Sequence, residues 1–313
     1  MVIEFAQGLM KRTFELNEGF GFIAQYLEWA NRKVFFGTLM LPVISYRGHS
    51  SADWDLLPSM YRDKPQLNAE KTNYLRQCEA EVICEFRSRF GLSDWTDLEV
   101  LAYAQHHGAP TGLLDWTENP LIGLWFAVSE KQYDSQPGVV HQLNAEPSSS
   151  LICGGVDLTL EHAWGPSAKR FAFLRLASKL ESPQSVEGSC KRPIHVFRSP
   201  SRLGRTGRQR SVFSVSCDAW VDKPLNQVLQ NNRELRKIEV PSSVKSLLRY
   251  VLPTLGLDPF SIYGGPDAFG RSLAHRFDFA DFLDSLPEPS TGSNTNTKAM
   301  TADKEGTENS PAP

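Results

Sequence analysis

Residues 105–127 read QHHGAPTGLLDWTENPLIGLWFA and contain a clear succession of secondary structure. A helix ends at Gly108, since glycine tolerates the backbone of a helix C-terminus. The apolar run TGLLDW then favours a short strand. Thr117 or Asn119 caps a second helix, with Pro120 in its first turn, where a missing amide costs nothing. Helix, strand and helix in such close succession are typical of a domain that mixes α and β structure.

Long helices and short strands continue on both sides of this stretch. Apolar residues at helical intervals predict helices near residues 20–30, 69–89 and 242–256. A capping box formed by Thr96 and Glu99 marks the start of another helix. Alternating apolar residues in RPIHVFRS, RSVFSVS and LRKIEVP predict strands.

We therefore expect an α+β (mixed α/β) fold: a single globular domain over residues 1–284, with short central strands flanked by helices. The weakly patterned stretch 130–190 predicts loops and insertions. Residues 285–313 are rich in Pro, Ser, Thr, Asn and Gly and contain almost no apolar side chains. Because such a segment buries too little surface to offset the entropy of ordering, we predict a disordered tail there.

The composition argues against several classes of protein. The net charge of −3 and the pI near 6.2 give no global basic field, so binding of nucleic acid would need a local patch. No apolar stretch approaches the ~20 residues of a membrane span, and acids within the N-terminal segment argue against a signal peptide. The five cysteines show no CxxC spacing. They predict reduced thiols in a cytoplasmic protein, without disulfides or structural zinc.

An arginine stands where an apolar run ends in ISYRGHSSADWDLLPSMYR, residues 44–62. The guanidinium of Arg47 offers a planar fork of donors for phosphate or carboxylate, and Gly48 permits close approach of another group to the backbone. One interpretation is an anion-binding arginine at the rim of a pocket. The alternative is a structural ion pair with Asp53 or Asp55, because a buried charge needs a partner.

Polar residues also stand at both ends of the strand predicted within residues 105–127. His106 and His107 precede it, but neighbours on a helix diverge by ~100°, so we expect no metal there. Hydrogen bonding of these rings to helix-end carbonyls is the common alternative. Asp115 is a candidate catalytic carboxylate, although an aspartate that caps a turn or helix is the more frequent case. A hydrolase that combines Asp115 with His106 would need a second carboxylate to hold a metal, and none stands out.

A third polar stretch is RLGRTGRQRSVFSVS, residues 202–216. Its arginines form either a solvated basic loop, as most short basic runs do, or a phosphate-contacting loop that delivers Gln209 toward a cleft. No Walker, Rossmann, HExxH or GxSxG signature occurs in a convincing context. Standard motifs therefore assign no reaction to the chain.

Taken together, these stretches resemble the FRG domain family, whose name comes from a Phe/Tyr-Arg-Gly signature, here Tyr46-Arg47-Gly48. The similar blocks are residues 44–62, 105–127, 202–216 and 255–273. Two positions depart from the family pattern. Gly112 stands where arginine is common, which removes a possible cation beside Asp115. Ser211 stands where glycine is expected, so the backbone there is less permissive.

The order of the motifs is similar to that of ADP-ribosyltransferases, which implies a split sheet and NAD as cofactor. In that fold an early arginine holds the NAD phosphates or ribose, a second motif shapes the nicotinamide pocket, and a glutamate stabilises the ribosyl cation. The resemblance puts Arg47, Asp115-Trp116-Thr117 and Gln209 in these places. Gln209 is neutral and cannot supply the stabilising charge, whereas Asp115 can. Trp116 would stack on nicotinamide.

The resemblance thus implies a set of site residues and leaves two functions open. The implied catalytic residues are Arg47, Asp115 and Gln209, and the implied cofactor-binding residues are Arg47, Gly48, His106, Trp116, Thr117 and Arg205. One function is an ADP-ribosyltransferase-like enzyme, or a glycohydrolase, that uses NAD and modifies nucleic acid or protein. The other is a non-catalytic module that binds a nucleotide or nucleic acid. FRG domains occur in bacterial and phage genomes, in contexts that suggest phage defence or a toxin.

Overall fold

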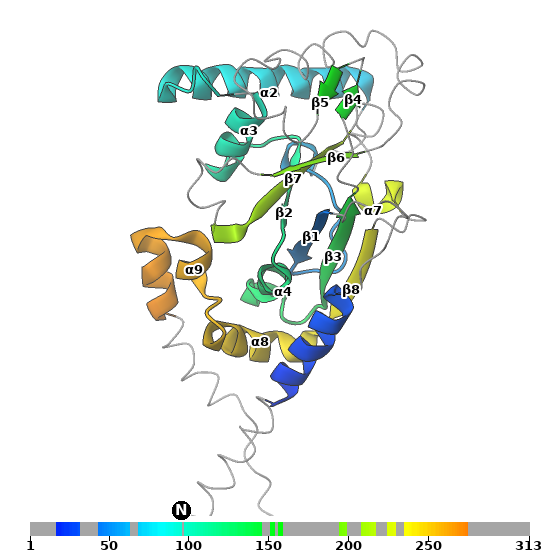
Figure 1. Cartoon of the computed structure of the whole chain (residues 1–313), viewed down its shortest axis with the longest axis vertical. Coiled ribbons are helices and arrows are strands. Elements are labelled where there is room, and N and C mark those ends of the chain that lie inside the picture. The colour runs from blue at the N-terminus through cyan, green and yellow to red at the C-terminus, as the bar shows by residue number, and fades with distance from the viewer. Residues whose placement is uncertain are drawn as a thin grey trace, which may run out of the picture.

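The computed structural model describes most of the segments that carry these motifs (Figure 1). The described residues are 17–31, 43–62, 68–95, 97–145, 151–153, 156–158, 194–198, 208–216, 224–229 and 235–274. Thr96, Arg205 and the predicted tail at 285–313 lie outside them. The limits of the domain therefore stay a prediction.

An antiparallel sheet of six strands forms the centre of the described structure, in the order β6-β7-β2-β1-β3-β8. Its strands are β1 (Val43–His49), β2 (Leu113–Thr117), β3 (Gly138–Ala145), β6 (Ile194–Arg198), β7 (Ser211–Ser216) and β8 (Leu235–Val240). A separate hairpin pairs β4 (Leu151–Cys153) with β5 (Val156–Leu158). An antiparallel sheet flanked by helices confirms the expected α+β fold.

Helices gather at two ends of the sheet (Figure 1). At one end lie α2 (Ala69–Phe90) and α3 (Asp97–His106). At the other lie α4 (Pro120–Val128), α8 (Ser242–Thr254) and a helix over residues 17–30. The shorter helical segments are η1 (Ser59–Tyr61), η2 (Lys131–Tyr133), α7 (Leu225–Val228), α9 (Pro259–Tyr263) and a helix over residues 265–274. The helices predicted near residues 20–30, 69–89 and 242–256 are confirmed.

The sequence allowed either Thr117 or Asn119 as the N-terminal cap of α4, and the structure has Asn119. The Asn119 side chain accepts a hydrogen bond from the Leu121 amide at 3.0 Å, and Pro120 follows in the first turn. Thr117 instead directs its hydroxyl to the carbonyl of Gln209, at 2.6 Å. Asn119 therefore begins the helix, and Thr117 joins β2 to the segment that precedes β7.

The two central strands, β1 and β2, separate after one register pair. They pair at Tyr46 and Thr117, whereas β1 pairs with β3 along its whole length. At the next position of β1, Arg47 reaches across the gap and donates from Nη1 to the Asp115 carbonyl at 2.7 Å. The Asp115 carbonyl has no hydrogen-bond partner in the backbone of β1, and the Arg47 side chain takes the place of that partner. The sheet consequently opens beside Arg47.

Close packing of α4 on the sheet explains Gly48. A Cβ at this position would lie 2.0 Å from the Gly123 carbonyl oxygen and 2.6 Å from the Ala127 amide nitrogen, both in α4. A Cβ at Gly123 would lie 2.8 Å from the Cβ of Tyr46. On the side where a Cβ would point, the group that approaches Gly48 is therefore the backbone of α4, and the role of Gly48 in binding a ligand stays a prediction.

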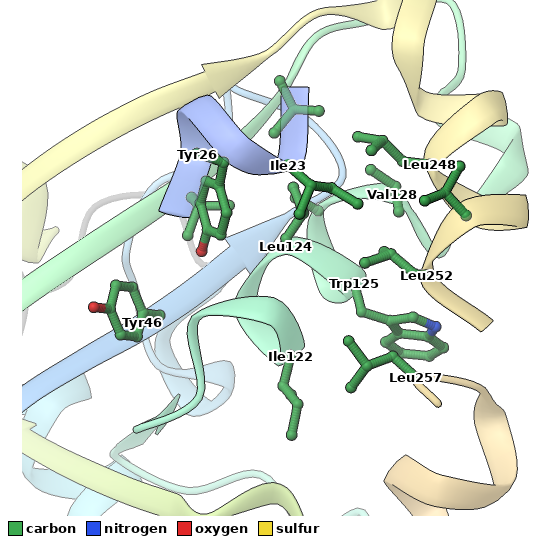
Figure 2. Packing of buried hydrophobic residues seen from close by; sticks show 14 of the residues in the cluster. Ile23, Tyr26, Tyr46, Ile122, Leu124, Trp125, Val128, Leu248, Leu252 and Leu257 are labelled. Atoms are coloured by element: carbon green, nitrogen blue, oxygen red, sulfur yellow. The ribbon is translucent and has the colours of Figure 1, made fainter. Parts of the chain in front are cut away.

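A hydrophobic cluster fixes α4 between the sheet and two other helices (Figure 2). Ile23 and Tyr26 come from the helix over residues 17–30, Leu124 from α4 and Leu248 from α8, and all are buried. The Tyr26 hydroxyl also donates to the Pro120 carbonyl at 2.6 Å. Since full burial of a large apolar side chain contributes roughly 1.5–3 kcal/mol, this cluster holds α4 firmly in place.

A second cluster holds α3 against β2 and β7. It includes Val100 and Leu101 from α3, Leu113 from β2 and Phe213 from β7, all buried. Two independently packed helices, α3 and α4, therefore flank β2. This arrangement leaves space between them for a site.

Candidate functional site

A cavity of about 790 Å³ lies between α3 and α4, beside the opening of the sheet. Its size is that of small-molecule sites, which run from roughly 300 to 1,000 Å³. Its lining comes from β1 and the loop after it, α3, β2, α4, η2, the turn before β7, and α9.

The cavity collects predicted site residues from three distant segments. Arg47, Asp115 and Gln209 all line it, and so do the other predicted residues that the structure describes, namely Gly48, His106, Trp116 and Thr117. Arg205 lies outside the described residues. The roles of all these residues stay predictions, but their convergence on one cavity is a property of the fold.

Arg47 has neutral hydrogen-bond partners in place of the acids that its neighbourhood offered. Its Nε donates to His49 Nε2 at 2.9 Å, and its Nη1 donates to the Asp115 carbonyl. Within the described residues it forms no ion pair, so the alternative of a structural pair with Asp53 or Asp55 does not occur. Burial lowers the pKa of Arg47 to about 10, and the guanidinium stays protonated at neutral pH. The cavity wall therefore carries a positive charge without a salt bridge, and the negative charge of Asp115 acts on it without forming one.

A second arginine faces the same region. Arg62 lines the cavity, and its Nε donates to the Leu57 carbonyl at 2.8 Å. Its positive charge lowers the pKa of both Arg47 and His49, which shows that the groups are close enough to interact. Two like charges repel each other, and an anion between them would relieve that repulsion.

The ring beneath Arg47 is neutral. Because His49 Nε2 accepts from Arg47, the ring proton is on Nδ1, which faces the Trp54 carbonyl at 3.3 Å. Burial, and then the charge of Arg47, lower the pKa of His49 to about 2. His141 packs edge-on against His49 with ring centroids 5.5 Å apart. Burial lowers the pKa of His141 to about 4.

Asp115 presents an oriented carboxylate to the cavity. Gln105 Nε2 donates to Asp115 Oδ1, and the Thr111 hydroxyl donates to Gln105 Oε1. Because an ionised carboxylate only accepts hydrogen bonds, the amide nitrogen of Gln105 faces Asp115 and its amide oxygen faces the Thr111 hydroxyl. Thr111 is fully buried, whereas Asp115 is exposed. One oxygen of the Asp115 carboxylate is therefore held by Gln105, while the side chain remains accessible from the cavity.

Gln209 is positioned through its main chain. Its carbonyl accepts from the Thr117 hydroxyl, and the carbonyl of Arg210 accepts from the Glu118 amide at 3.1 Å. Arg210 has a φ of 47°, a left-handed conformation that is costly for a non-glycine residue. The strained turn is thus tied to the end of β2. Ser211, where the family pattern has glycine, begins β7 without a positive φ.

Trp116 lines the cavity, but most of its ring is packed inside the protein. The side chain is buried in a cluster with Leu114 and Val212, and its Nε1 donates to the Ser214 hydroxyl at 2.8 Å. Trp116 is only 3% exposed, and its hydrogen bond holds β2 to β7. Stacking of its ring on nicotinamide stays a prediction, and this burial argues against it.

A more exposed tryptophan that lines the cavity is Trp54, in the loop after β1. It is 37% exposed, lines the cavity, and contacts the ring of Tyr133 edge-to-face with centroids 4.8 Å apart. The buried ammonium group of Lys245 supports this wall, because it donates to the carbonyls of Ser50 at 2.8 Å and Tyr133 at 2.5 Å. Lys245 of α8 therefore holds the backbone at Tyr133 and at Ser50, four residues before Trp54.

The cavity is not uniformly basic. Its cations are Arg47 and Arg62, and its carboxylates are Asp53, Asp55, Asp115 and Glu130. Asp55 accepts a hydrogen bond from Asn226 Nδ2 at 2.9 Å. A phosphate would accordingly be held by the two arginines and not by the overall charge of the cavity. Within the described residues, no cluster of side chains is suited to a metal ion.

Residues 43–136 match the FRG domain family. This match covers less than half of the chain. The matched segment includes Arg47, Trp54, Arg62, Asp115 and Tyr133, whereas Gln209 lies beyond it. No curated protein and no solved structure matches the chain. None of the helices in the described part is long and apolar enough to cross a bilayer.

Several cavity residues of the FRG domain escaped prediction from sequence. His49, Trp54 and Arg62 all stand in the stretch 44–62, but nothing in their spacing gave them a role. Gln105 belonged to the family block, and its spacing from Asp115 carried no sign of contact. Only Trp54 offered a signal, since a tryptophan between two aspartates in a loop is unusual for a buried apolar residue.

Proposed function

We propose that the FRG domain binds NAD in the cavity and acts as an ADP-ribosyltransferase-like enzyme that modifies a macromolecule, nucleic acid or protein. The observation that carries this proposal is the convergence of Arg47, Asp115 and Gln209 on one cavity, where Arg47 forms no salt bridge with any described acid. Roles in phage defence or as a toxin, in the cytoplasm, belong to the proposal and rest on the family resemblance and the absence of a CxxC pattern.

The residues present fit NAD in size and in charge. The cavity of about 790 Å³ is large enough for a dinucleotide. Arg47 and Arg62 supply protonated guanidinium groups for a diphosphate, and charge-assisted hydrogen bonds to phosphate are among the strong ones. Asp115 supplies a carboxylate that is oriented by Gln105 and faces the cavity.

When bound, NAD supplies an N-glycosidic bond that breaks with its electron pair leaving on nicotinamide, while the ADP-ribosyl group joins a nucleophile that loses one proton to solvent. Positive charge develops at the ribose as this bond breaks, and the Asp115 carboxylate would stabilise it electrostatically. Arg47 would hold the phosphates, and Gln209 would orient a ribose hydroxyl. Water as the nucleophile gives glycohydrolysis, and a macromolecular nucleophile gives transfer.

The test is release of nicotinamide and transfer of label from NAD to components of a cell extract. We expect Arg47→Ala to weaken NAD binding by about a hundredfold, because it removes a charge and two hydrogen-bond donors. Arg47→Lys keeps the charge but loses the planar fork, so we expect a loss of roughly tenfold. Arg89→Ala is the control, since Arg89 pairs with Glu85 on the exposed face of α2.

The outcomes separate the two functions that the sequence left open. Neither nicotinamide release nor labelled product from the wild-type protein would rule out the enzyme. Binding of NAD without release would instead identify a non-catalytic nucleotide-binding module. In that case salt should weaken binding steeply, because contacts to phosphate dominate it.

A further inference from the structure

The proposed function leaves one conspicuous part of the cavity without a role. Trp54 exposes 37% of its surface, in contact with Tyr133 and within 5.9 Å of the His49 ring, centroid to centroid. Exposure of a large apolar ring in a cavity is unfavourable unless something covers it. Neither the phosphate contacts of Arg47 nor the carboxylate of Asp115 makes use of this ring.

Contacts connect this ring to the rest of the site in a fixed order. Trp54 neighbours His49, which accepts from Arg47, which in turn donates to the backbone of Asp115. The sequence of chemical groups along the cavity is therefore aromatic ring, cation, carboxylate. A dinucleotide such as NAD has a compatible order of adenine base, phosphates and second ribose, which places its phosphates at the cation.

We infer that Trp54 stacks on the base of a nucleotide whose phosphate groups lie at Arg47 and Arg62. The ligand class is an adenine nucleotide, with the base at the aromatic end and the phosphate at the arginines. The direction of the dinucleotide rests on the proposed function: if the reacting ribose lies at Asp115, the adenine end lies at Trp54.

The charges beside Trp54 support this assignment. Asp53 and Asp55 flank the indole in the sequence and line the same cavity. Carboxylates repel phosphate, but they accept hydrogen bonds from an exocyclic amino group such as that of adenine. His49 is neutral and adds no charge to this wall. The aromatic end is thus suited to a base, and the two arginines to the phosphate.

The experiment is calorimetric titration of the full chain with AMP, ribose 5-phosphate and nicotinamide mononucleotide. Stacking of a base on an aromatic side chain changes affinity by roughly five- to a hundredfold. We expect Trp54→Ala to lower the affinity for AMP about tenfold and to change the affinity for ribose 5-phosphate by less than twofold. Trp54→Phe should restore most of the AMP affinity. Tyr74→Ala is the control, because Tyr74 is exposed on α2 and does not line the cavity.

Three results would overturn the inference. One is an equal loss of AMP and ribose 5-phosphate in Trp54→Ala, which would mean that the ring only shapes the loop. Another is selective loss of nicotinamide mononucleotide, which would reverse the direction of the ligand. The third is the absence of AMP binding by the wild-type protein. Binding of AMP that depends on Trp54, in a protein that releases no nicotinamide, would uphold this subsite and remove only the proposed catalysis.

Discussion

Arg47 satisfies its donors with a histidine nitrogen and a backbone carbonyl, both of which are neutral. Asp53 and Asp55 were the partners expected from the local sequence. In the fold, Arg47 instead donates to His49 and to the Asp115 carbonyl. The consequence is a protonated guanidinium whose charge no described acid cancels at ion-pair distance. At this scale the site combines a cation that forms no salt bridge, Arg47, with an oriented carboxylate, Asp115.

Gln105 provides a prediction at the same scale, because it acts on the reaction only through Asp115. Gln105→Leu removes the donor to Asp115 Oδ1 and leaves the carboxylate free to rotate. We expect the rate of nicotinamide release to fall about tenfold while NAD affinity changes less than twofold, as befits a positioning residue. Asp115→Asn should cost at least a hundredfold in rate. A loss of affinity equal to the loss of rate in Gln105→Leu would contradict this role.

The packing of α4 on β1 is the decisive contact between elements. Gly48 and Gly123 let the helix backbone approach the strand more closely than any side chain would allow. The approach fixes α4 beside β2 and so defines one wall of the cavity. The sequence flagged Gly48 correctly as a place of close approach but could not say which group approached.

Gly48→Ala should therefore destabilise the protein strongly. The added methyl group would clash with backbone atoms of α4, which cannot move aside as a flexible side chain can. We expect a loss of about 3 kcal/mol or more in the free energy of unfolding, measured by urea denaturation. Gly21→Ala is the matched control, since a Cβ there has no atom within 4 Å and the helix gains propensity. A Gly48→Ala variant as stable as wild type would refute the packing argument.

Across the whole molecule, the buried histidines make stability depend on pH. The pKa of His49 is lowered to about 2 and that of His141 to about 4, whereas both titrate near 6.5 in the unfolded chain. Below about pH 6.5 the unfolded chain binds protons that the folded chain does not, so acid favours unfolding. Arg47 and Lys237 contribute to the lowering of the pKa of His141, after burial.

We expect the free energy of unfolding to fall by about 2–3 kcal/mol between pH 7.5 and 5.5 and to be insensitive to these rings above pH 7.5. His141→Leu should reduce the slope by about half. His107→Gln, at an exposed ring, serves as the control. Stability that stays flat over this range, or an unchanged slope in His141→Leu, would show that the rings are not held neutral.

The sequence by itself determined the α+β class, the helix and strand positions around residues 105–127, and the three segments that carry the polar residues of the cavity. These features follow from local rules, namely apolar periodicity, caps and turn residues, and from family motifs that are continuous in the chain. Arg47, Asp115 and Gln209 stand in such continuous motifs, so the sequence alone singled them out before the cavity was known.

Only the tertiary structure decided which side chains face the cavity and which are used for packing. Trp116 and Trp54 each follow an aspartate in the sequence, yet the first is buried on a sheet and the second is exposed on a loop. Similarly, the partner of Arg47 comes from a strand that lies beside β1 but far along the chain. Burial and partner choice depend on contacts between distant segments, and local patterns carry no information about them.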